Sequence, residues 1–151
     1  MELHPDWKEF LRLLNSHGVE YLIVGAHALA FHGHPRYTAD IDFFIRTTQA
    51  NAERLYDVLC EFGFGGSLDG PEDLLKQPAV FMLGRQPFRI DLLNHIDGVE
   101  FAGAWERRVV SELDGISVPF ISLDDYVANK RAAGRKKDAY DLEALGVEPE
   151  P

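Results

Sequence analysis

Apolar residues follow a helical period near the start of the chain. They fall at i, i+3, i+4 and i+7, and they are Trp7, Phe10, Leu11 and Leu14. This spacing predicts an amphipathic helix with one buried face, for which Pro5 suits the first turn and Gly18 the end. The same period predicts a helix from Gln49 to Phe62. Further helical segments are predicted over residues 26–31, 72–76 (one turn), 100–107, 123–133 and 136–145.

Runs rich in β-branched and aromatic residues predict the strands. They cover residues 19–24, 40–45, 80–83, 88–93, 109–113 and 116–121. Two pairs of these runs are joined by turn residues, Gly84-Arg85-Gln86-Pro87 and Asp114-Gly115, and are predicted to form antiparallel hairpins. Ser122 is predicted to cap the helix that follows, with Asp125 three residues later in a variant of the capping box.

The order of these elements indicates the fold class. It reads α-β-α-β-α-β-β-(α)-β-β-α-α, which is typical of an α+β fold with a mixed sheet flanked by helices. A length of 151 residues suits one domain. We therefore expect a single domain over residues 1–147 and a frayed tail at 148–151.

Composition and charge narrow the class of protein. Lys and Arg total 15 against 25 Asp and Glu, and the resulting net charge of −10 argues against a protein that coats nucleic acid by bulk positive charge. Cys60 is the only cysteine, so an intramolecular disulfide and a cysteine-based zinc site are excluded. The first residues lack the pattern of a signal peptide, and the apolar runs are far shorter than the about 18 residues of a membrane span. We therefore expect a cytoplasmic protein without membrane association.

Three aspartates stand out as candidate catalytic residues. Asp40 and Asp42 lie at i and i+2 of a predicted strand, so both side chains point to one face while Ile41 and Phe43 point to the other. Asp91 alternates with apolar residues in a later strand. If the two strands are neighbours in the sheet, the three carboxylates converge.

Converging carboxylates predict a metal site, because a divalent cation removes their mutual repulsion. Carboxylate oxygens suit a hard ion such as Mg²⁺ or Mn²⁺, which keeps water and substrate phosphates in its shell. The alternative is that Asp40 caps the preceding loop and Asp42 is solvated on an edge strand. Three features favour the metal site: the third acid, a basic cluster near the C-terminus, and a strand-to-helix junction at Gly25-Ala26 whose free N–H groups suit a phosphate.

These motifs resemble those of the DNA polymerase β-type nucleotidyltransferase superfamily. Val24-Gly25-Ala26 is followed, after thirteen residues, by Asp40-Ile41-Asp42-Phe43, with Asp91 on a later strand. The wider stretch 24–45 and the C-terminal stretch 122–138 are similar to AbiEii-like and other small bacterial nucleotidyltransferases. The resemblance covers nearly the whole chain.

The resemblance implies a polymerase β palm-like fold and a function. The implied reaction transfers a nucleoside monophosphate from a nucleoside triphosphate (NTP), bound with Mg²⁺, to an acceptor hydroxyl. Gly25 and Ala26 match the phosphate loop, and Lys130 and Arg135 match basic residues near the triphosphate. The residues that match the metal ligands and catalytic acids, with Asp91 also a candidate to receive the acceptor's proton, are Asp40, Asp42 and Asp91.

One position departs from the family pattern, since Ala26 stands where relatives have Gly or Ser. Ala26 has no hydroxyl for a phosphate, which leaves two hypotheses: an active enzyme, and a non-catalytic nucleotide- or partner-binding module such as an antitoxin. For the enzyme, the acceptor could be a small molecule, an RNA end or a partner protein. A toxin–antitoxin partner or a homodimer would fit either hypothesis.

Other residues near these motifs have open roles. The C-terminal basic residues Lys130, Arg131, Arg135, Lys136 and Lys137 either clamp a triphosphate or lie on a solvated helix face. The spacing cannot place all five on one face, and we assign phosphate binding to Lys130 and Arg135 and a solvated face to the other three. Arg36 could contact phosphate or lie on the surface. For His27, His32 and His34, polar lining of the cleft is favoured over zinc binding. Tyr37 could stack on a base, whereas Phe31 is better explained by core packing.

Overall fold

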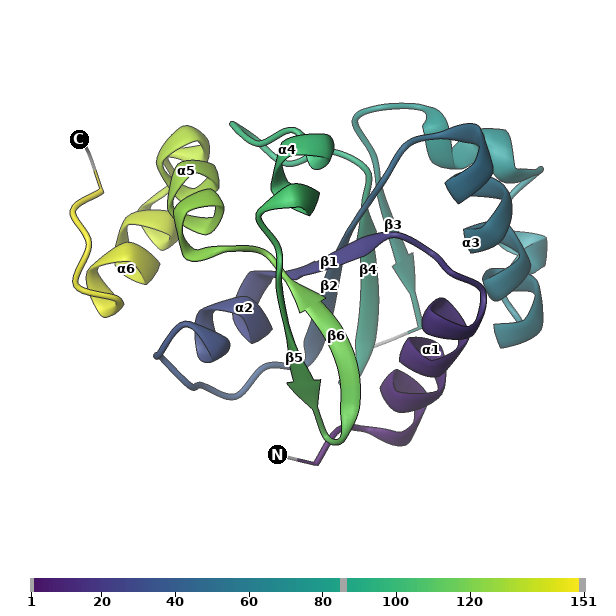
Figure 1. The fold of residues 1–151 in the computed structure, drawn as a ribbon, viewed down its shortest axis with the longest axis horizontal. Helices are drawn as coiled ribbons and strands as arrows, with labels where there is room; N and C mark the ends of the chain where they lie inside the picture. Colours follow the sequence, from purple (N-terminus) through teal and green to yellow (C-terminus); the bar gives the residue numbers. More distant parts are fainter. Residues whose placement is uncertain (1, 85–86, 150–151) are drawn as a thin grey trace.

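A six-stranded mixed sheet forms the centre of the computed structural model, which describes residues 2–84 and 87–149. Its strand order is β3-β4-β2-β1-β6-β5 (Figure 1). The strands are β1 (Tyr21–Val24), β2 (Asp40–Ile45), β3 (Val80–Leu83), β4 (Arg89–Leu93), β5 (Val109–Leu113) and β6 (Ile116–Phe120). Strand β2 pairs in parallel with β4, and β1 with β6, whereas the other neighbours are antiparallel.

Helices cover this sheet and begin and end at residues suited to those positions. They are α1 (Pro5–Ser16), α2 (Gly25–Phe31), α3 (Gln49–Phe62), α4 (Phe101–Glu106), α5 (Leu123–Ala133) and α6 (Lys136–Ala144), with two short 3₁₀ helices, η1 (Gly65–Ser67) and η2 (Pro71–Leu75). The Thr48 and Ser122 hydroxyls accept N-terminal backbone N–H groups of α3 and α5. Gly63 and Gly134 end these two helices in the left-handed conformation.

The two faces of the sheet bury separate hydrophobic clusters. On one face, α1, α3 and η2 pack against alternate strand residues such as Ile41 and Phe43, both fully buried. On the other face, α2, α4 and α5 cover a smaller cluster around Leu22 and Phe44 (Figure 1). Successive strand residues point to opposite faces, so the second face carries Asp40 and Asp42 beyond the edge of its cluster. This uncovered part of the second face is where the candidate site lies.

The structure confirms the α+β fold class and both predicted hairpins. Strands β5 and β6 are joined by Asp114 and Gly115, which have φ of 49° and 79°, the two positive values that a tight hairpin turn requires. Strands β3 and β4 also pair antiparallel, and residues 85 and 86 of their turn lie outside the described residues. In the predicted tail 148–151, the Glu148 carbonyl accepts hydrogen bonds from Arg131, and residues 150 and 151 lie outside the described part.

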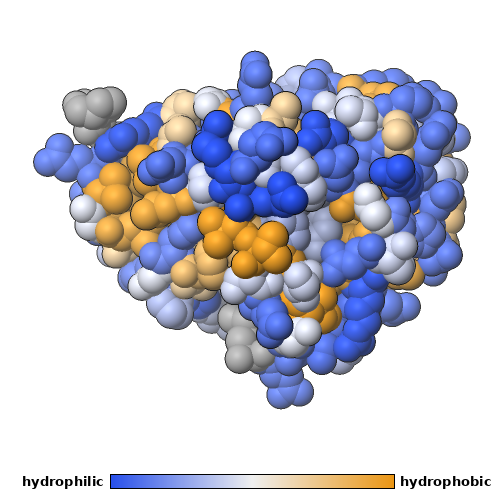
Figure 2. Space-filling view, in the orientation of Figure 1, coloured by the Kyte–Doolittle hydropathy of each residue, from blue (hydrophilic) through white to orange (hydrophobic). Residues whose placement is uncertain are grey.

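The surface is mostly hydrophilic on the face shown in Figure 2, where hydrophobic side chains gather in separate patches. The two edge strands contribute exposed apolar residues, Val80 and Met82 from β3 and Val109 and Val110 from β5. In the part of the chain that the structure describes, no helix combines the length and the apolar character needed to cross a membrane.

Candidate active site

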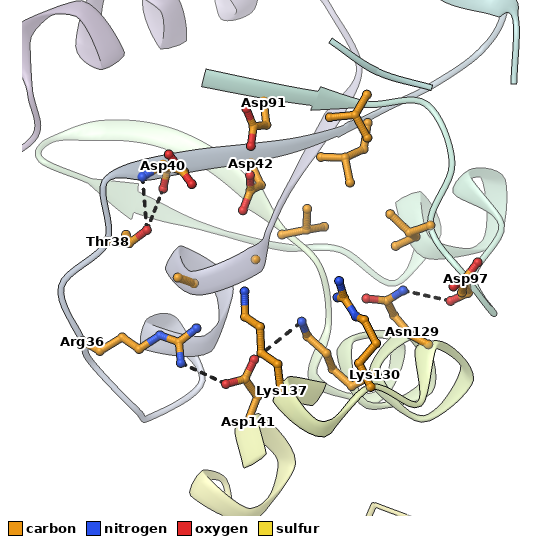
Figure 3. A pocket seen from close by; sticks show the side chains of 18 of the residues that line it. Arg36, Thr38, Asp40, Asp42, Asp91, Asp97, Asn129, Lys130, Lys137 and Asp141 are labelled. Carbon is orange, nitrogen blue, oxygen red and sulfur yellow. Dashed lines mark hydrogen bonds and ion pairs between the residues drawn. The ribbon is translucent and has the colours of Figure 1, made fainter. Parts of the chain in front are cut away.

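A cleft of about 720 Å³ lies over the second face of the sheet, between the strands and the C-terminal helices (Figure 3). Its sheet side carries acidic side chains and its helical side carries basic ones. It brings together every site residue predicted from the sequence: Gly25, Ala26, Asp40, Asp42, Asp91, Lys130 and Arg135.

The three aspartates meet because β2 and β4 are neighbours. Asp42 is the direct register partner of Asp91 in this parallel pair, and Asp40 precedes Asp42 by two residues on the same strand face. Ile41 and Phe43 point away into the main core, as their alternation predicted. Figure 3 shows the three carboxylates pointing into the cleft from the two strands. The sequence predicted that the three carboxylates would converge if their two strands were neighbours in the sheet, and in the structure they do.

Gly25 allows the end of β1 to approach the carboxylates closely. Its φ is +68°, a conformation that residues with a side chain rarely adopt. A Cβ atom at this position would lie 2.9 Å from Cγ of Asp42 and would collide with its carboxylate. Glycine is thus required twice, for its backbone conformation and for the space beside Asp42. Ala26 follows as the second residue of α2 and also lines the cleft.

Arg89 lies among the acids and was not identified from the sequence. Its Nε donates to Oδ1 of Asp91 at 2.8 Å, and its Nη2 donates to Oδ2 of Asp91 at 3.1 Å and to Oδ2 of Asp40 at 3.2 Å. The bidentate geometry fixes the Asp91 carboxylate and joins it to Asp40. The sequence does contain a sign of this contact, because Arg89 precedes Asp91 by two residues and so shares its strand face.

The environment of Asp42 favours its protonated form. Burial, the charge of Asp91, a hydrogen bond with Asp91 and the charge of Asp40 raise the pKa of Asp42 to about 7, while the charge of Lys137 acts in the opposite direction. Asp40 and Asp91 have Arg89 as a counter-charge, and Asp42 has the two acids as its near neighbours. Repulsion within the acidic group is therefore concentrated on Asp42.

The backbone of Asp40 is held by two residues of the preceding segment. The Thr38 hydroxyl accepts the N–H of Asp40 at 3.2 Å and lies 3.0 Å from its carbonyl. His27 on α2 is 4% exposed and hydrogen-bonds to the backbone of Asp40, while its burial lowers the pKa of the imidazole. His27, His32 and His34 are not among the residues that line the cleft, so the polar lining predicted for them is wrong. His27 instead supports the acidic group from a buried position behind Asp40.

The basic side of the cleft is an ion-pair network centred on two buried acids of α6. Lys130 is 8% exposed, and its Nζ lies 3.3 Å from Asp138 and 3.6 Å from Asp141. Arg36, from the loop before β2, contacts Asp141 at 2.9 Å. Burial alone would raise the pKa of Asp138, but hydrogen bonds from Arg135 and the charge of Lys130 outweigh it and lower the pKa to about 2.

Two further basic residues lie at the start of α6. Arg135 caps this helix with Asp138 as its partner, and its side chain is largely exposed at the cleft. Lys137 also lines the cleft, which corrects its assignment to a solvated helix face. Arg131, by contrast, donates to the carbonyl of Glu148, and Lys136 is exposed outside the cleft lining. As neighbours on α6, Lys136 and Lys137 point in directions about 100° apart, and the helical period alone could not tell which one faces the strands.

Comparison with protein families shows which family the chain belongs to. The model of the family described as "Nucleotidyl transferase of unknown function (DUF2204)" matches residues 4–147. The chain belongs to the DUF2204 family. The match spans Gly25-Ala26, the three aspartates and the C-terminal basic residues. The predicted nucleotidyltransferase relationship is thereby confirmed at the level of family, without a specific AbiEii-like assignment.

Solved structures share the fold of this DUF2204 protein. A candidate nucleotidyltransferase from Thermotoga maritima has a TM-score of 0.58 at 17% identity, covering 94% of this chain and 93% of that one. An antigenic nucleotidyltransferase-like protein from Paracoccidioides brasiliensis has a TM-score of 0.53 at 16% identity, covering 93% and 72%. At these identities the likeness establishes the fold alone. No curated protein sequence matches the chain.

The acidic group of the DUF2204 protein offers the oxygen ligands that a hard cation prefers, but these carboxylates are arranged around a different positive group. Among residues 2–84 and 87–149, no three His, Cys, Asp or Glu side chains form a preformed metal site. The guanidinium of Arg89 supplies the positive charge between Asp40 and Asp91 instead. Three carboxylates beside a polar cleft remain a donor set that suits Mg²⁺ or Mn²⁺.

The structure places the two aromatic candidates, Phe31 and Tyr37, in different environments. Phe31 stacks on the buried ring of Phe120, with ring centroids 4.1 Å apart and planes 9° apart, but it is 38% exposed and so packs at the edge of the core instead of inside it. Tyr37 is 79% exposed and lines the cleft near the basic residues. Tyr37 therefore remains the candidate for stacking on a nucleotide base.

Proposed function

We propose that this protein transfers a nucleoside monophosphate from an NTP to an acceptor hydroxyl, with Mg²⁺ or Mn²⁺ as cofactor. The observation that supports it is the register of β2 with β4, which faces Asp42 with Asp91 and brings Asp40 beside them. The same cleft carries basic side chains on its opposite wall, where a triphosphate would be neutralised. Membership in a nucleotidyltransferase family is the second line of support.

Each wall of the cleft has its own task in this proposal. Asp40, Asp42 and Asp91 would hold the divalent cation, which supplies charge stabilisation to the reacting phosphate when it is bound. Gly25 keeps the backbone close to Asp42, and the adjacent N–H of Ala26 is available to a phosphate oxygen although the residue offers no hydroxyl. Thr38 and His27 hold the backbone of Asp40 so that its carboxylate direction is set.

The proposed reaction is a displacement at the α-phosphorus of the NTP. The acceptor oxygen forms a bond to this phosphorus, the bond to the bridging oxygen of the β-phosphate breaks, and pyrophosphate leaves with that bond's electron pair. The acceptor hydroxyl proton passes to Asp91, which is the assigned proton acceptor. Arg89 positions Asp91 for this step, because two of its hydrogen bonds fix the carboxylate plane.

The acceptor is proposed by class only. A small molecule, an RNA end and a partner protein are the three candidates, and a toxin–antitoxin role corresponds to one of the last two. The basic residues that a nucleic acid would need are the same ones assigned to the triphosphate. An acceptor supplied by a partner protein, or by a second copy of the chain, would leave those residues to the nucleotide.

A non-catalytic nucleotide-binding module is the second candidate function. The position of Arg89 favours it, because a guanidinium between Asp40 and Asp91 satisfies these carboxylates without a metal. Ala26 favours it as well, through the missing hydroxyl at the phosphate loop. In such a module the NTP would bind and would remain intact.

Label transfer distinguishes the two functions. The protein is incubated with each NTP labelled at the α-phosphate, with Mg²⁺ or Mn²⁺ and with RNA, protein and small-molecule fractions of a cell extract. Transfer to one fraction by the wild type, its loss with EDTA and its loss in Asp42→Asn support the enzyme. Asp57→Asn, an exposed carboxylate on α3, is the matched control and should transfer at the wild-type rate. Transfer by Asp42→Asn at the wild-type rate would refute the mechanism, and nucleotide binding without any transfer would favour the module.

A further inference from the structure

Among the residues that the structure describes, one basic side chain of the cleft has a charge that is not already paired with an acid of the protein. We propose that Lys137 is the principal triphosphate-binding residue, and that Lys130, the residue matched by family resemblance, is a structural ion-pair partner. The inference rests on the proposed function, since it names the residue that binds the nucleotide in that same cleft.

The other basic residues of the cleft are held by carboxylates. Lys130 contacts both buried acids of α6, and its ammonium also lies 5.3 Å from the ring centroid of Tyr126. Arg36 contacts Asp141 at 2.9 Å, and Arg135 contacts Asp138 at 2.8 Å. To bind a phosphate, Lys130 would have to leave two buried carboxylates without their counter-charge, which is costly inside a protein.

Lys137 is in a different situation. Within residues 2–84 and 87–149 it forms no ion pair, and its side chain is exposed. Figure 3 shows it extending from α6 into the cleft toward Asp42. An ammonium in this position faces the acidic group across the space that a metal-bound triphosphate would fill.

This placement gives Lys137 opposite effects on two ligands. A triphosphate is an anion, so it gains a charge-assisted contact from an ammonium that has no competing partner. A divalent cation that binds alone to the acidic group is repelled by the same ammonium. Removing the charge at residue 137 should therefore weaken nucleotide binding and should leave binding of the free cation unchanged or tighter. A variant that merely disturbed the fold would weaken both.

The test measures two affinities on four forms of the full chain. The probes are Mn²⁺ alone and, in the presence of Mg²⁺, α,β-methylene-ATP, whose methylene bridge prevents transfer. The forms are the wild type, Lys137→Ala, Lys137→Arg and Lys136→Ala. Lys136→Ala is the matched control, because it removes the same charge from the adjacent exposed position outside the cleft. Thermal melting verifies that all four forms are folded.

The expected result is a loss of about 10-fold in nucleotide affinity for Lys137→Ala, as for one charge-assisted hydrogen bond, with Mn²⁺ binding no weaker than in the wild type. Lys137→Arg should retain most of the affinity, and Lys136→Ala should match the wild type. Unchanged nucleotide affinity in Lys137→Ala, an equal loss in Lys136→Ala, or a parallel loss of Mn²⁺ binding would each overturn the inference. If the wild type binds none of the four NTPs at millimolar concentration, the proposed function itself fails and the inference fails with it.

Discussion

The two walls of the cleft are charged in opposite senses and are built by different means. On the sheet wall, strand register aligns Asp42 with Asp91 and leaves like charges side by side. On the helical wall, Asp138 and Asp141 neutralise most of the basic residues that surround them. The sheet wall is thus electrostatically strained without a ligand, and the helical wall is satisfied. Changes on the sheet wall should alter ligand binding and chemistry, whereas most changes on the helical wall should alter stability.

The largest effect is expected from Asp42→Asn. The substitution keeps the size of the side chain but removes a charge from the proposed metal site, so transfer should fall by about 1000-fold, in the range found when one charge-stabilising group is removed. The fold should persist, because one of three repelling carboxylates becomes neutral. Initial rates of label transfer and the melting temperature check the two parts. If Asp42→Asn lost activity because it unfolded, the claim that the sheet wall governs chemistry and not stability would be wrong.

Lys130→Met should act on stability instead. The variant leaves Asp138 and Asp141 buried with fewer counter-charges, and breaking such a buried pair costs about 3 kcal/mol. Urea unfolding of Lys130→Met beside Lys136→Met, the exposed neighbour on α6, measures this difference. Equal free energies of unfolding for the two variants would show that the helical wall is not held by these ion pairs.

Gly25→Ala tests the junction between the walls. An alanine here must adopt a left-handed backbone, at about 1–2 kcal/mol, and its Cβ must displace the carboxylate of Asp42. We expect a loss of about 2 kcal/mol in the free energy of unfolding together with weaker Mn²⁺ binding. Gly18→Ala, which has a similar φ of +67° but open space around it, is the control that separates backbone strain from the collision. Only the Gly25 variant should lose metal affinity.

Arg89→Gln sharpens the distinction between enzyme and module. Removing the guanidinium frees Asp40 and Asp91, so the affinity for free Mn²⁺ should rise several-fold, since a competing positive charge has left. Transfer should nevertheless slow, because Asp91 loses the two hydrogen bonds that orient it. Isothermal titration with Mn²⁺ and the label-transfer assay report the two effects. Weaker Mn²⁺ binding would contradict the role of Arg89 as a stand-in for the metal.

The smallest effect concerns pH. The folded state holds a proton on Asp42 up to a pKa of about 7, whereas an unfolded chain releases it near the ordinary value of an aspartate. Between these values the folded state binds more protons, so its stability should fall as pH rises from about 4 to about 7 and then level off. With chelator present, the melting temperature should drop by a few degrees, since solvent in the open cleft screens the repulsion. Asp42→Asn should remove this decline.

The local structure was largely predictable from the sequence. The helix over residues 49–62 and the strand over residues 40–45 have the predicted bounds, and Ser122 and the Asp114-Gly115 turn act as predicted. These features depend on contacts between residues a few positions apart, so short-range periodicity, capping and turn preferences are sufficient. The aspartate pair at i and i+2 belongs to the same class, because strand alternation alone places both side chains on one face.

Only the tertiary structure decided which charges meet. Arg89 reaches Asp40 across 49 positions of sequence, and Arg36 reaches Asp141 across 105. No local period links such residues, and a charged side chain gives the same pattern in sequence whether it is solvated, buried in an ion pair or open to a ligand. That is why Lys130 matched the family pattern yet lies buried between two acids, and why Lys137, one position from the solvated Lys136, faces the cleft. The sequence determined the elements and the acidic motif, whereas the pairing of β2 with β4 and the placement of α5 and α6 across the cleft from them determined the electrostatic partner of each residue.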